Sequence, residues 1–130
     1  MKRSMQFFTA VIIAMSLFMT SGAFAQDPVK VDSTHYKVEF ENDQVRVLRI
    51  TYGPGEKSVM HEHPGSVAVF LTDVQGQFTF PDGKTVPVAP KEGQVMWDQG
   101  GKHLPANTGD KPFSLILVEL KSTPAAPKKN

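Results

Sequence analysis

The chain has 130 residues, 40% of them hydrophobic, and a formal net charge of +1 at pH 7. This size and composition fit one small globular domain and argue against two domains or wholesale disorder. The near-zero charge argues against nucleic acid as the main partner, because phosphate binding normally requires an excess of Lys and Arg. No cysteine is present, which excludes disulfides, thiolate metal sites and cysteine nucleophiles. Any chemistry therefore depends on histidines, carboxylates or hydroxyls.

The first 25 residues have the pattern of a secretory signal peptide. Lys2 and Arg3 precede an apolar run over residues 7–19, and the segment ending at Ala25 supplies the small residues that a signal peptidase recognises. The apolar run is shorter than the roughly 20 residues that cross a bilayer, and no cysteine follows it to carry a lipid. We therefore predict cleavage after Ala25 and export to the periplasm or the medium, without a stable membrane anchor.

Residues 26–121 are predicted to form a single domain of short strands. Apolar and charged residues alternate over residues 36–41 and 45–52, as they do in half-buried strands. Residues 67–71 are apolar throughout, which is typical of a strand buried on both faces or at a subunit contact. Without cross-links, this small core is sufficient by itself or is completed by a metal or by a second subunit in a homodimer.

The second half of the chain continues the strand pattern. Asp82 and Gly83 predict a hairpin turn within residues 78–86, and further strands are predicted over residues 94–98 and 113–121. Ten prolines and ten glycines leave few windows for a helix, and no segment shows a 3.6-residue period. The sequence therefore predicts an all-β sandwich or barrel, followed by a loose tail over residues 122–130.

Three histidines are candidate metal ligands. His61 and His63 are separated by one residue, so a strand presents both imidazoles on the same face. Imidazole is the commonest protein ligand for Zn, Cu, Ni and Fe. His103 is a third candidate from a neighbouring strand, and three protein ligands leave a position open for water or a small-molecule ligand. The alternative is a solvated loop pair with an unrelated turn histidine.

The segment that begins at Gly55 resembles the first motif of the cupin superfamily. Gly55 is followed after five residues by His61 and His63, as in that motif. Where the motif has a metal-binding glutamate, this sequence has Val67 and Ala68, neither of which can bind a metal. The resemblance therefore implies a site made of neutral histidines.

A later segment is similar to the second cupin motif. Gly93 opens it, Gly100 lies in its turn, and His103 and Asn107 form its His-x-x-x-Asn ending. The two motifs together cover about residues 53–121. They imply a double-stranded β-helix, also called a jelly roll or cupin barrel, whose histidines line the mouth of a small barrel.

The resemblance implies that His61, His63 and His103 hold a divalent metal ion, which could be Zn, Mn, Fe, Ni or Cu. Cupins with three histidines include iron-dependent dioxygenases of small thiols, and others are isomerases or binding proteins. The sequence therefore predicts a metal-dependent enzyme of the dioxygenase or isomerase type acting on a small organic molecule. The alternatives are a non-catalytic metal or small-molecule binding protein and a structural role with vestigial histidines. Catalytic and substrate-binding residues are not assigned.

Four residues near these motifs have simpler interpretations. We predict Trp97 to be a core residue, with a pocket position as the alternative. Asp98 is predicted to form a turn, with a fourth ligand or general base as the alternative. Glu62 and His35 are predicted to lie at the surface. The barrel interior is predicted to contain the following apolar side chains: Val67, Val69, Leu71, Phe78, Phe80, Met96 and Leu115.

Overall fold

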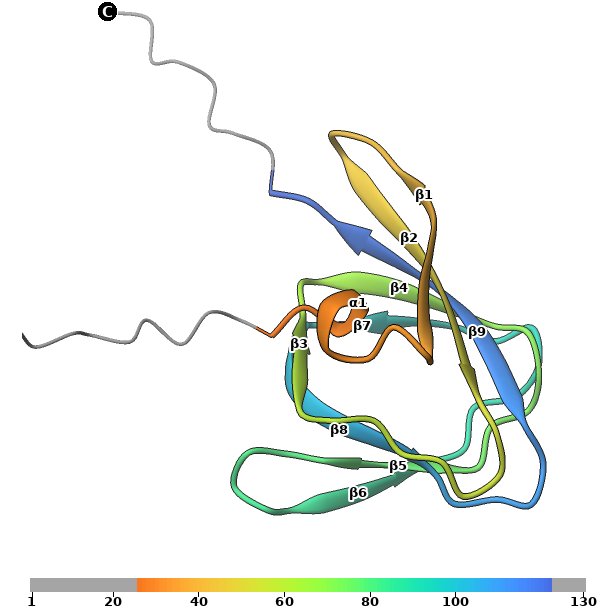
Figure 1. The fold of residues 1–130 in the computed structure, drawn as a ribbon. Coiled ribbons are helices and arrows are strands. Elements are labelled where there is room, and N and C mark those ends of the chain that lie inside the picture. Colours follow the sequence, from red (N-terminus) through yellow and green to blue (C-terminus); the bar gives the residue numbers. More distant parts are fainter. Residues whose placement is uncertain (1–25, 123–130) are drawn as a thin grey trace, which may run out of the picture.

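The computed structural model describes residues 26–122 (Figure 1). The predicted signal peptide over residues 1–25 lies outside this part of the chain, as do residues 123–130 of the predicted tail. Within residues 26–122, no helix has the length and apolar character that a membrane span requires.

The described chain folds into strands, with one short helix before them. Helix α1 spans Pro28–Val31, and the strands are β1 (Tyr36–Glu41), β2 (Val45–Tyr52), β3 (His61–His63), β4 (Ser66–Phe70), β5 (Gly76–Thr79), β6 (Thr85–Val88), β7 (Val95–Asp98), β8 (Gly101–Asn107) and β9 (Phe113–Leu120). All neighbouring strands are antiparallel. A five-stranded sheet has the order β1-β2-β9-β4-β7, and a four-stranded sheet has the order β3-β8-β5-β6. Figure 1 shows the two sheets curving around a common interior. The predicted all-β fold is confirmed.

Strand β2 shows how the sequence pattern produces this architecture. Leu48, Ile50 and Tyr52 alternate with exposed or half-buried residues and are at most 5% exposed. Successive side chains of a strand point to opposite faces, so these three face the interior. The strand pairs with β9 in one unbroken register, from Val45 opposite Leu120 to Tyr52 opposite Phe113. The strand β1 also forms as predicted, but only Tyr36 in it is buried.

Strand β4 corrects one prediction. Ser66 and Ala68 are buried, whereas Val67 and Val69 are half-buried and Leu71, just beyond the strand, is 38% exposed. The prediction that residues 67–71 are buried on both faces is therefore wrong. Its alternative, a subunit contact at the half-buried face, stays a prediction.

The hydrophobic core belongs mainly to the inner face of the five-stranded sheet. Its buried residues are Tyr36, Leu48, Ile50, Tyr52, Ala68, Val74, Phe113 and Leu117. Tyr36 and Tyr52 satisfy their hydroxyl groups with each other, at an O–O distance of 2.7 Å. Burial raises the pKa of Tyr52 to about 12, so its phenol stays neutral at physiological pH. Because the Tyr36 ring packs edge-on against His61 at 4.8 Å between centroids, this core supports the histidines directly.

Candidate metal centre

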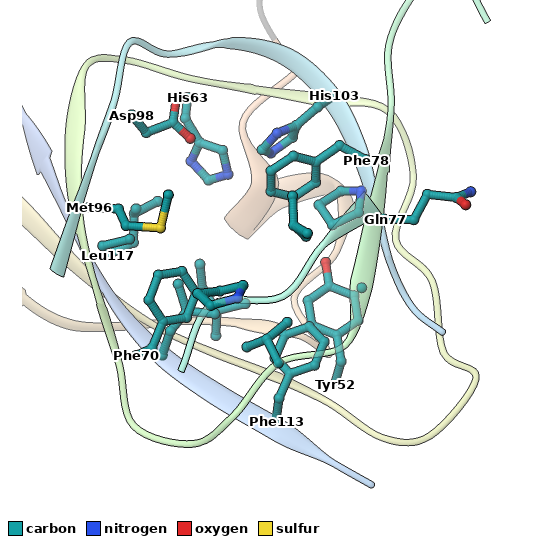
Figure 2. Close-up of a pocket in the computed structure, with 18 of the residues that line it drawn as sticks. Tyr52, His63, Phe70, Gln77, Phe78, Met96, Asp98, His103, Phe113 and Leu117 are labelled. Carbon is teal, nitrogen blue, oxygen red and sulfur yellow. The ribbon is translucent and has the colours of Figure 1, made fainter. Parts of the chain in front are cut away.

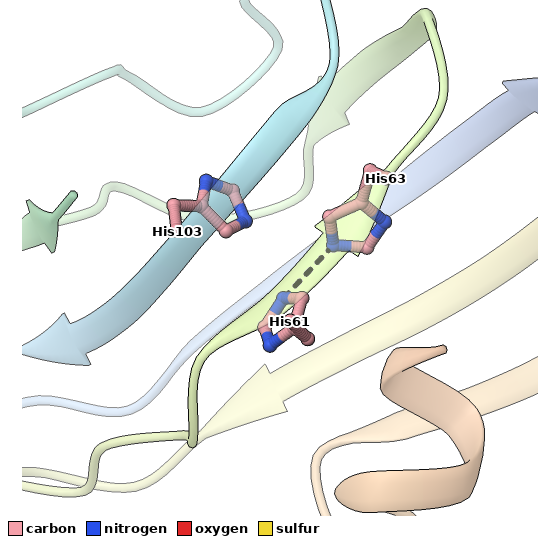
Figure 3. A group of neighbouring side chains, drawn as sticks. All are labelled: His61, His63 and His103. Atoms are coloured by element: carbon pink, nitrogen blue, oxygen red, sulfur yellow. Dashed lines mark hydrogen bonds between the residues drawn. The ribbon is translucent and has the colours of Figure 1, made fainter. Parts of the chain in front are cut away.

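Strand pairing brings the three candidate histidines together. His61 lies directly opposite His103 in the β3–β8 ladder, and His63 is two residues along β3 on the same face. The potential ligand atoms of the three residues all lie within 4.8 Å of one another. Figure 3 shows the rings of His61 and His63 on β3 turned toward the ring of His103 on β8. The structure therefore forms a three-histidine group that could hold a metal ion.

Hydrogen bonds fix the orientation of the two histidines on β3. The Nδ1 atom of His61 donates to the carbonyl oxygen of Val59 at 2.8 Å, and Nδ1 of His63 donates to the carboxylate of Glu119 at 2.6 Å. Both acceptors lack protons, so both Nδ1 atoms carry one. The remaining atom of each ring, Nε2, then presents a lone pair to the interior of the site.

The three inward nitrogens fit a cation. Nε2 of His61 and Nε2 of His63 are 3.0 Å apart, and a hydrogen bond between them requires one ring to carry two protons. One metal ion at the usual distance of about 2.0–2.1 Å can contact both nitrogens. Nε2 of His103 is buried and has no hydrogen-bond partner within the described residues. A buried unpaired nitrogen is costly, and a metal ion satisfies it.

The electrostatic environment keeps two of the rings neutral. Burial and the neighbouring His63 lower the pKa of His61 from 6.5 to about 4. Burial and the same neighbours, His63 and His61, lower the pKa of His103 to about 3. Metal binding requires neutral imidazole, so protons do not compete for these two residues at neutral pH.

Glu119 on β9 is a residue of the site that the sequence did not reveal. Its side chain is 3% exposed, and it accepts hydrogen bonds from His63 on one oxygen and from Arg46 on the other, each at 2.6 Å. Burial opposes ionisation of Glu119, but these two hydrogen bonds outweigh it and lower its pKa. Arg46 also donates to Asp27 at 2.8 Å, next to helix α1. Glu119 therefore holds His63 from behind, as carboxylates commonly do for metal-binding histidines.

His61 has a weaker polar contact behind it. The hydroxyl of Ser58 lies 3.3 Å from Nδ1 of His61 and donates to Asp32 at 2.5 Å. Asp32 also accepts from His35 at 2.7 Å, and the ring of His35 stacks on Tyr52 with centroids 4.3 Å apart. The side chain of His35 is only 11% exposed, so the prediction of a surface histidine is wrong. His35 lies outside the three-histidine group.

The other motif residues shape the backbone around the histidines. Gly100 has a φ of +82°, and a Cβ atom there would lie 2.6 Å from the carbonyl oxygen of His63, so only glycine fits. Asp98 accepts a hydrogen bond from the backbone NH of Gly100 at 2.7 Å, which confirms its predicted turn-forming role. Asn107 is 2% exposed and bonds the backbone of Lys111 and Gly109. Glu62, between the two histidines, is half-buried.

A cavity of about 600 Å³ lies beside the histidines and is bordered by both His63 and His103. Figure 2 shows these two rings at one end of the cavity and the aromatic rings of Phe70, Phe113 and Tyr52 at the other. The predicted interior is right for four residues that border it: Phe78, Phe80, Met96 and Leu115. It is wrong for Val67, Val69 and Leu71.

Trp97 also borders the cavity, and its position corrects another prediction. The residue is 53% exposed, so its assignment to the core is wrong. It lies in β7, an edge strand that pairs only with β4 in its sheet, so no neighbouring strand covers its other side.

Comparisons with known proteins give matches at the level of structure. No protein-family model and no curated protein matches the sequence. A cupin domain from Bordetella pertussis Tohama I superposes with a TM-score of 0.62 at 25% identity, over 67% of this chain and 92% of that one.

Two further solved structures share the fold at lower identity. A cupin superfamily protein from Desulfitobacterium hafniense DCB-2 has a TM-score of 0.51 at 16% identity, over 67% of this chain and 76% of that one. An RmlC-like cupin family protein with a double-stranded β-helix fold, from Methanocaldococcus jannaschii, has a TM-score of 0.52 at 17% identity, over 68% and 83%. With its two antiparallel sheets curved around a central cavity, this chain has the double-stranded β-helix fold and belongs to the cupin superfamily.

Proposed function

We propose that this protein is a cupin-type metalloprotein that binds one divalent metal ion through His61, His63 and His103. The observation that carries the proposal is the state of the three ring nitrogens that face the site. In His61 and His63, the hydrogen bond donated by Nδ1 leaves the lone pair of Nε2 pointing into the site. Nε2 of His103 is buried without a hydrogen-bond partner within the described residues. A set of three imidazoles suits Zn, Cu, Ni or Fe, and Mn is a further candidate.

The bound metal would supply a Lewis acid or an oxygen-activating centre beside the cavity. The chain's own residues prepare the site for this ion. Val59 and Glu119 hold the ring orientations of His61 and His63, which limits the reorganisation needed on binding. Phe78 packs on the ring of His103 at 4.6 Å between centroids and helps to exclude water from it.

The cavity indicates the class of small molecule that would bind next to the metal. Its walls are mainly aromatic and aliphatic, and the side chains of Gln77 and Gln94 add neutral hydrogen-bonding groups. Lys102 is the only Lys or Arg among the lining residues, and it lies in β8 next to His103, so its side chain points to the opposite face from the histidine. We therefore propose a largely apolar organic ligand, because apart from a bound metal ion the interior offers no cation to bind a carboxylate or phosphate.

We propose a metal-dependent enzyme of the dioxygenase or isomerase type as the first candidate and a non-catalytic metal or small-molecule binding protein as the second. One observation favours the second. Asp98 is the only carboxylate that borders the cavity, and its side chain already accepts a hydrogen bond from Gly100. The described lining therefore offers Asp98 alone as a carboxylate general base, and one of its oxygens is held by the backbone of Gly100.

The two candidates differ in turnover. We would load the purified protein with Fe, Mn, Zn, Ni or Cu and incubate it under oxygen with a panel of small thiols, diketones and hydroxy acids. Product that forms with wild type and disappears in His61→Ala supports the enzyme. Retained metal and ligand affinity without turnover supports the binding protein. If no metal binds at neutral pH even in excess, the metalloprotein proposal is wrong.

We also propose that the protein acts outside the cytoplasm, in the periplasm or the medium. The support is the sequence pattern of residues 1–25, in which Lys2 and Arg3 precede an apolar run that ends in small residues at Ala25. Intact-mass analysis of protein from the native compartment tests this. The expected mature chain begins at Gln26, and a mass that includes Met1 to Ala25 would contradict export.

A further inference from the structure

Residues 26–35 precede β1 and belong to neither sheet. They contain helix α1, which lies against both β1 and β3 (Figure 1). Pro28 in this helix is among the most deeply buried side chains of the described chain. The carbonyl oxygen of Gln26 accepts a hydrogen bond from the backbone NH of Glu62 at 3.0 Å. Because Glu62 lies between the two histidines of β3, this segment covers the edge of β3 that does not pair with β8.

Asp27 uses its two carboxylate oxygens on two different partners. Oδ1 accepts from the backbone NH of Val29 at 3.0 Å and so caps the start of α1. Oδ2 accepts from the guanidinium of Arg46 in β2 at 2.8 Å. Burial opposes ionisation of Asp27, but the hydrogen bonds from Arg46 and Val29 outweigh it and lower its pKa. Asp27 is therefore charged at neutral pH and joins the helix to β2.

Arg46 and Glu119 extend this contact to His63. Arg46 lies two residues before the buried Leu48 in β2, so its side chain also points to the interior. Its Nε donates to one oxygen of Glu119, whose other oxygen accepts from Nδ1 of His63. Three consecutive hydrogen bonds of 2.8, 2.6 and 2.6 Å therefore connect Asp27 to His63. Only 18% of the Arg46 side chain and 3% of the Glu119 side chain are exposed, so little water competes for these bonds.

The other end of the segment is fixed beside His61. Asp32, which follows α1, accepts from the hydroxyl of Ser58 at 2.5 Å and from Nδ1 of His35 at 2.7 Å. The same hydroxyl oxygen lies 3.3 Å from Nδ1 of His61. Residues 26–35 are therefore held at both ends by groups that contact the histidines of β3.

We propose that residues 26–35 position the metal ligands of β3, with Asp27 as a positioning residue for His63, so that docking of this segment and metal binding strengthen each other. This role depends on the metal site proposed above, because it concerns the same histidines. Coupling between two sites is reciprocal, so a segment that orients a ligand for the ion is held more firmly once the ion binds. None of its residues borders the cavity or belongs to the three-histidine group. Its effect therefore reaches the metal only through neighbouring groups such as Arg46 and Glu119.

Asp27→Ser separates the two contacts of Asp27. Serine is a good N-cap residue, so it can still accept from the NH of Val29, but it is uncharged and one bond shorter, so it loses the ion pair with Arg46. The affinity for Zn²⁺, measured by chelator competition, is expected to fall about three- to tenfold. The matched control is Asp73→Ser in the loop between β4 and β5. Asp73 also accepts from a backbone NH and pairs with a lysine, and its loss is expected to leave the affinity unchanged.

Proton NMR of the metal-free protein tests the orientation of the ring itself. The Nδ1 proton of His63 lies in a short, charge-assisted hydrogen bond to Glu119 and is expected to resonate far downfield. Asp27→Ser is expected to move this resonance upfield, because a less firmly held carboxylate makes a longer hydrogen bond. The Nδ1 proton of His61, which is bonded to the carbonyl of Val59, should stay in place. A general loss of stability would not single out His63.

Amide hydrogen exchange of the wild type tests the reciprocal effect without any substitution. Zn²⁺ is expected to slow exchange within residues 26–35 and at Glu62, whose NH donates to Gln26. The reference is Gly83 in the β5–β6 turn, whose NH donates to the carbonyl of Phe80. Its exchange should be the same with and without Zn²⁺. Equal protection of residues 26–35 in the two states would contradict the coupling.

The outcomes separate this positioning role from the metal site. If the wild type binds none of Zn, Mn, Fe, Ni and Cu, the proposed function is wrong, and the His63 resonance of the metal-free variant alone decides whether Asp27 positions the ring. If wild type and Asp27→Ser bind Zn²⁺ equally and the resonance does not move, the metal site stands and the positioning role is wrong. A fall in affinity without a change at His63, or one that Asp73→Ser reproduces, also overturns it. Circular dichroism verifies that each variant is folded.

Discussion

The two histidines of β3 and the single histidine of β8 are held in the site by different forces. His61 and His63 each donate a hydrogen bond through Nδ1, to Val59 and Glu119, and both residues are at most 4% exposed. His103 is half-buried, and its Nε2 has no hydrogen-bond partner within the described residues. Its ring contacts Phe78 and the other two histidines through packing alone.

Hydrogen bonds therefore orient the rings of His61 and His63, whereas packing alone positions the ring of His103. A hydrogen bond to Nδ1 selects one tautomer, so His61 and His63 are prepared for a cation before it arrives. Packing positions the His103 ring without selecting a tautomer. We therefore expect β3 to provide a preformed pair of ligands and His103 to gain its main polar contact only on metal binding. The following predictions test that distinction, from the largest expected effect to the smallest.

The largest effect is expected from removing the β8 ligand. His103→Ala leaves two ligands, which form a weak site, and we expect it to lose most of its bound metal although His61 and His63 remain. Removing the buried unpaired nitrogen also eliminates a destabilising group. The metal-free variant should therefore be about as stable as metal-free wild type, within the roughly 1–3 kcal/mol that such a group costs. Metal analysis and chemical denaturation measure the two effects.

The control is His35→Ala. His35 lies outside the three-histidine group, so metal content is expected to stay at the wild-type level. Its contacts with Asp32, Glu56 and Tyr52 are lost, so a modest fall in stability is expected. Equal metal content in wild type and His103→Ala would remove His103 from the site.

The second-largest effect is expected on the stability of the metal-free protein at acidic pH. His61 and His103 have pKa values lowered from 6.5 to about 4 and about 3 when folded, and they return toward 6.5 on unfolding. Below pH 6.5 the unfolded chain therefore binds protons that the folded chain does not. The metal-free protein should lose stability as pH falls from 6.5 through about 4 for His61 and to about 3 for His103, with no change from these groups above 6.5.

For His61 alone, the lowering of its pKa from 6.5 to about 4 corresponds to a loss of about 3 kcal/mol in the free energy of unfolding at low pH. Urea denaturation of metal-free protein at several pH values measures the slope. In His103→Ala one of the two groups is absent, so the slope below pH 6.5 should become shallower. An identical slope in the variant would mean that His103 is not held neutral in the folded protein.

The fold could be predicted from the sequence where apolar and polar residues alternate along a strand. Strands over residues 36–41 and 45–52 and the hairpin at Asp82 and Gly83 follow from local periodicity and turn residues, and all are present. Strand β8 was harder to delimit because it begins at Gly101 and contains Pro105, both unfavourable in strands. Which face of β4 is buried depends on its neighbours β9 and β7, which local sequence does not specify.

The site shows the same division between local and long-range information. The spacing of His61 and His63 placed both on one face, and the pairing of β3 with β8 brings His103 opposite. The partner of His63, Glu119, lies in the last strand, far away in sequence. One signal was present: Glu119 is the only charged residue in the inward series of Phe113, Leu115 and Leu117. A lone acid at an inward position of a buried strand indicates a buried partner.

The third prediction concerns this carboxylate. Glu119→Gln preserves the shape of the side chain but removes the negative charge that both His63 and Arg46 contact. Metal affinity is expected to fall about 10- to 100-fold, as for other residues behind metal-binding histidines. The variant should also be less stable, because Arg46 loses one of its two carboxylate partners. Chelator competition measures the affinity.

The matched control is Glu39→Gln. Glu39 also pairs with an arginine, Arg49, but that pair is exposed and far from the histidines in the fold. A surface ion pair contributes at most about 1 kcal/mol, so stability should change little and metal affinity not at all. Equal affinities in wild type and Glu119→Gln would show that the carboxylate does not support the metal site.

The smallest effect is expected from Ser58→Ala, which removes the weaker contact behind His61. The Ser58 hydroxyl lies 3.3 Å from Nδ1 of His61, whereas the carbonyl of Val59 is at 2.8 Å and remains in the variant. Because the shorter bond already selects the tautomer, the affinity for metal should fall only a few-fold, in line with about 1 kcal/mol for one hydrogen bond.

The lost bond to Asp32 should appear instead as a higher pKa of that carboxyl group, because Ser58 donates one of the hydrogen bonds that offset burial and lower the pKa. Chelator competition and carboxyl NMR titration measure the two effects. If Ser58→Ala weakened metal binding as much as Glu119→Gln, the hydroxyl and not the Val59 carbonyl would position His61, and the two histidines of β3 would both depend on side chains for their orientation.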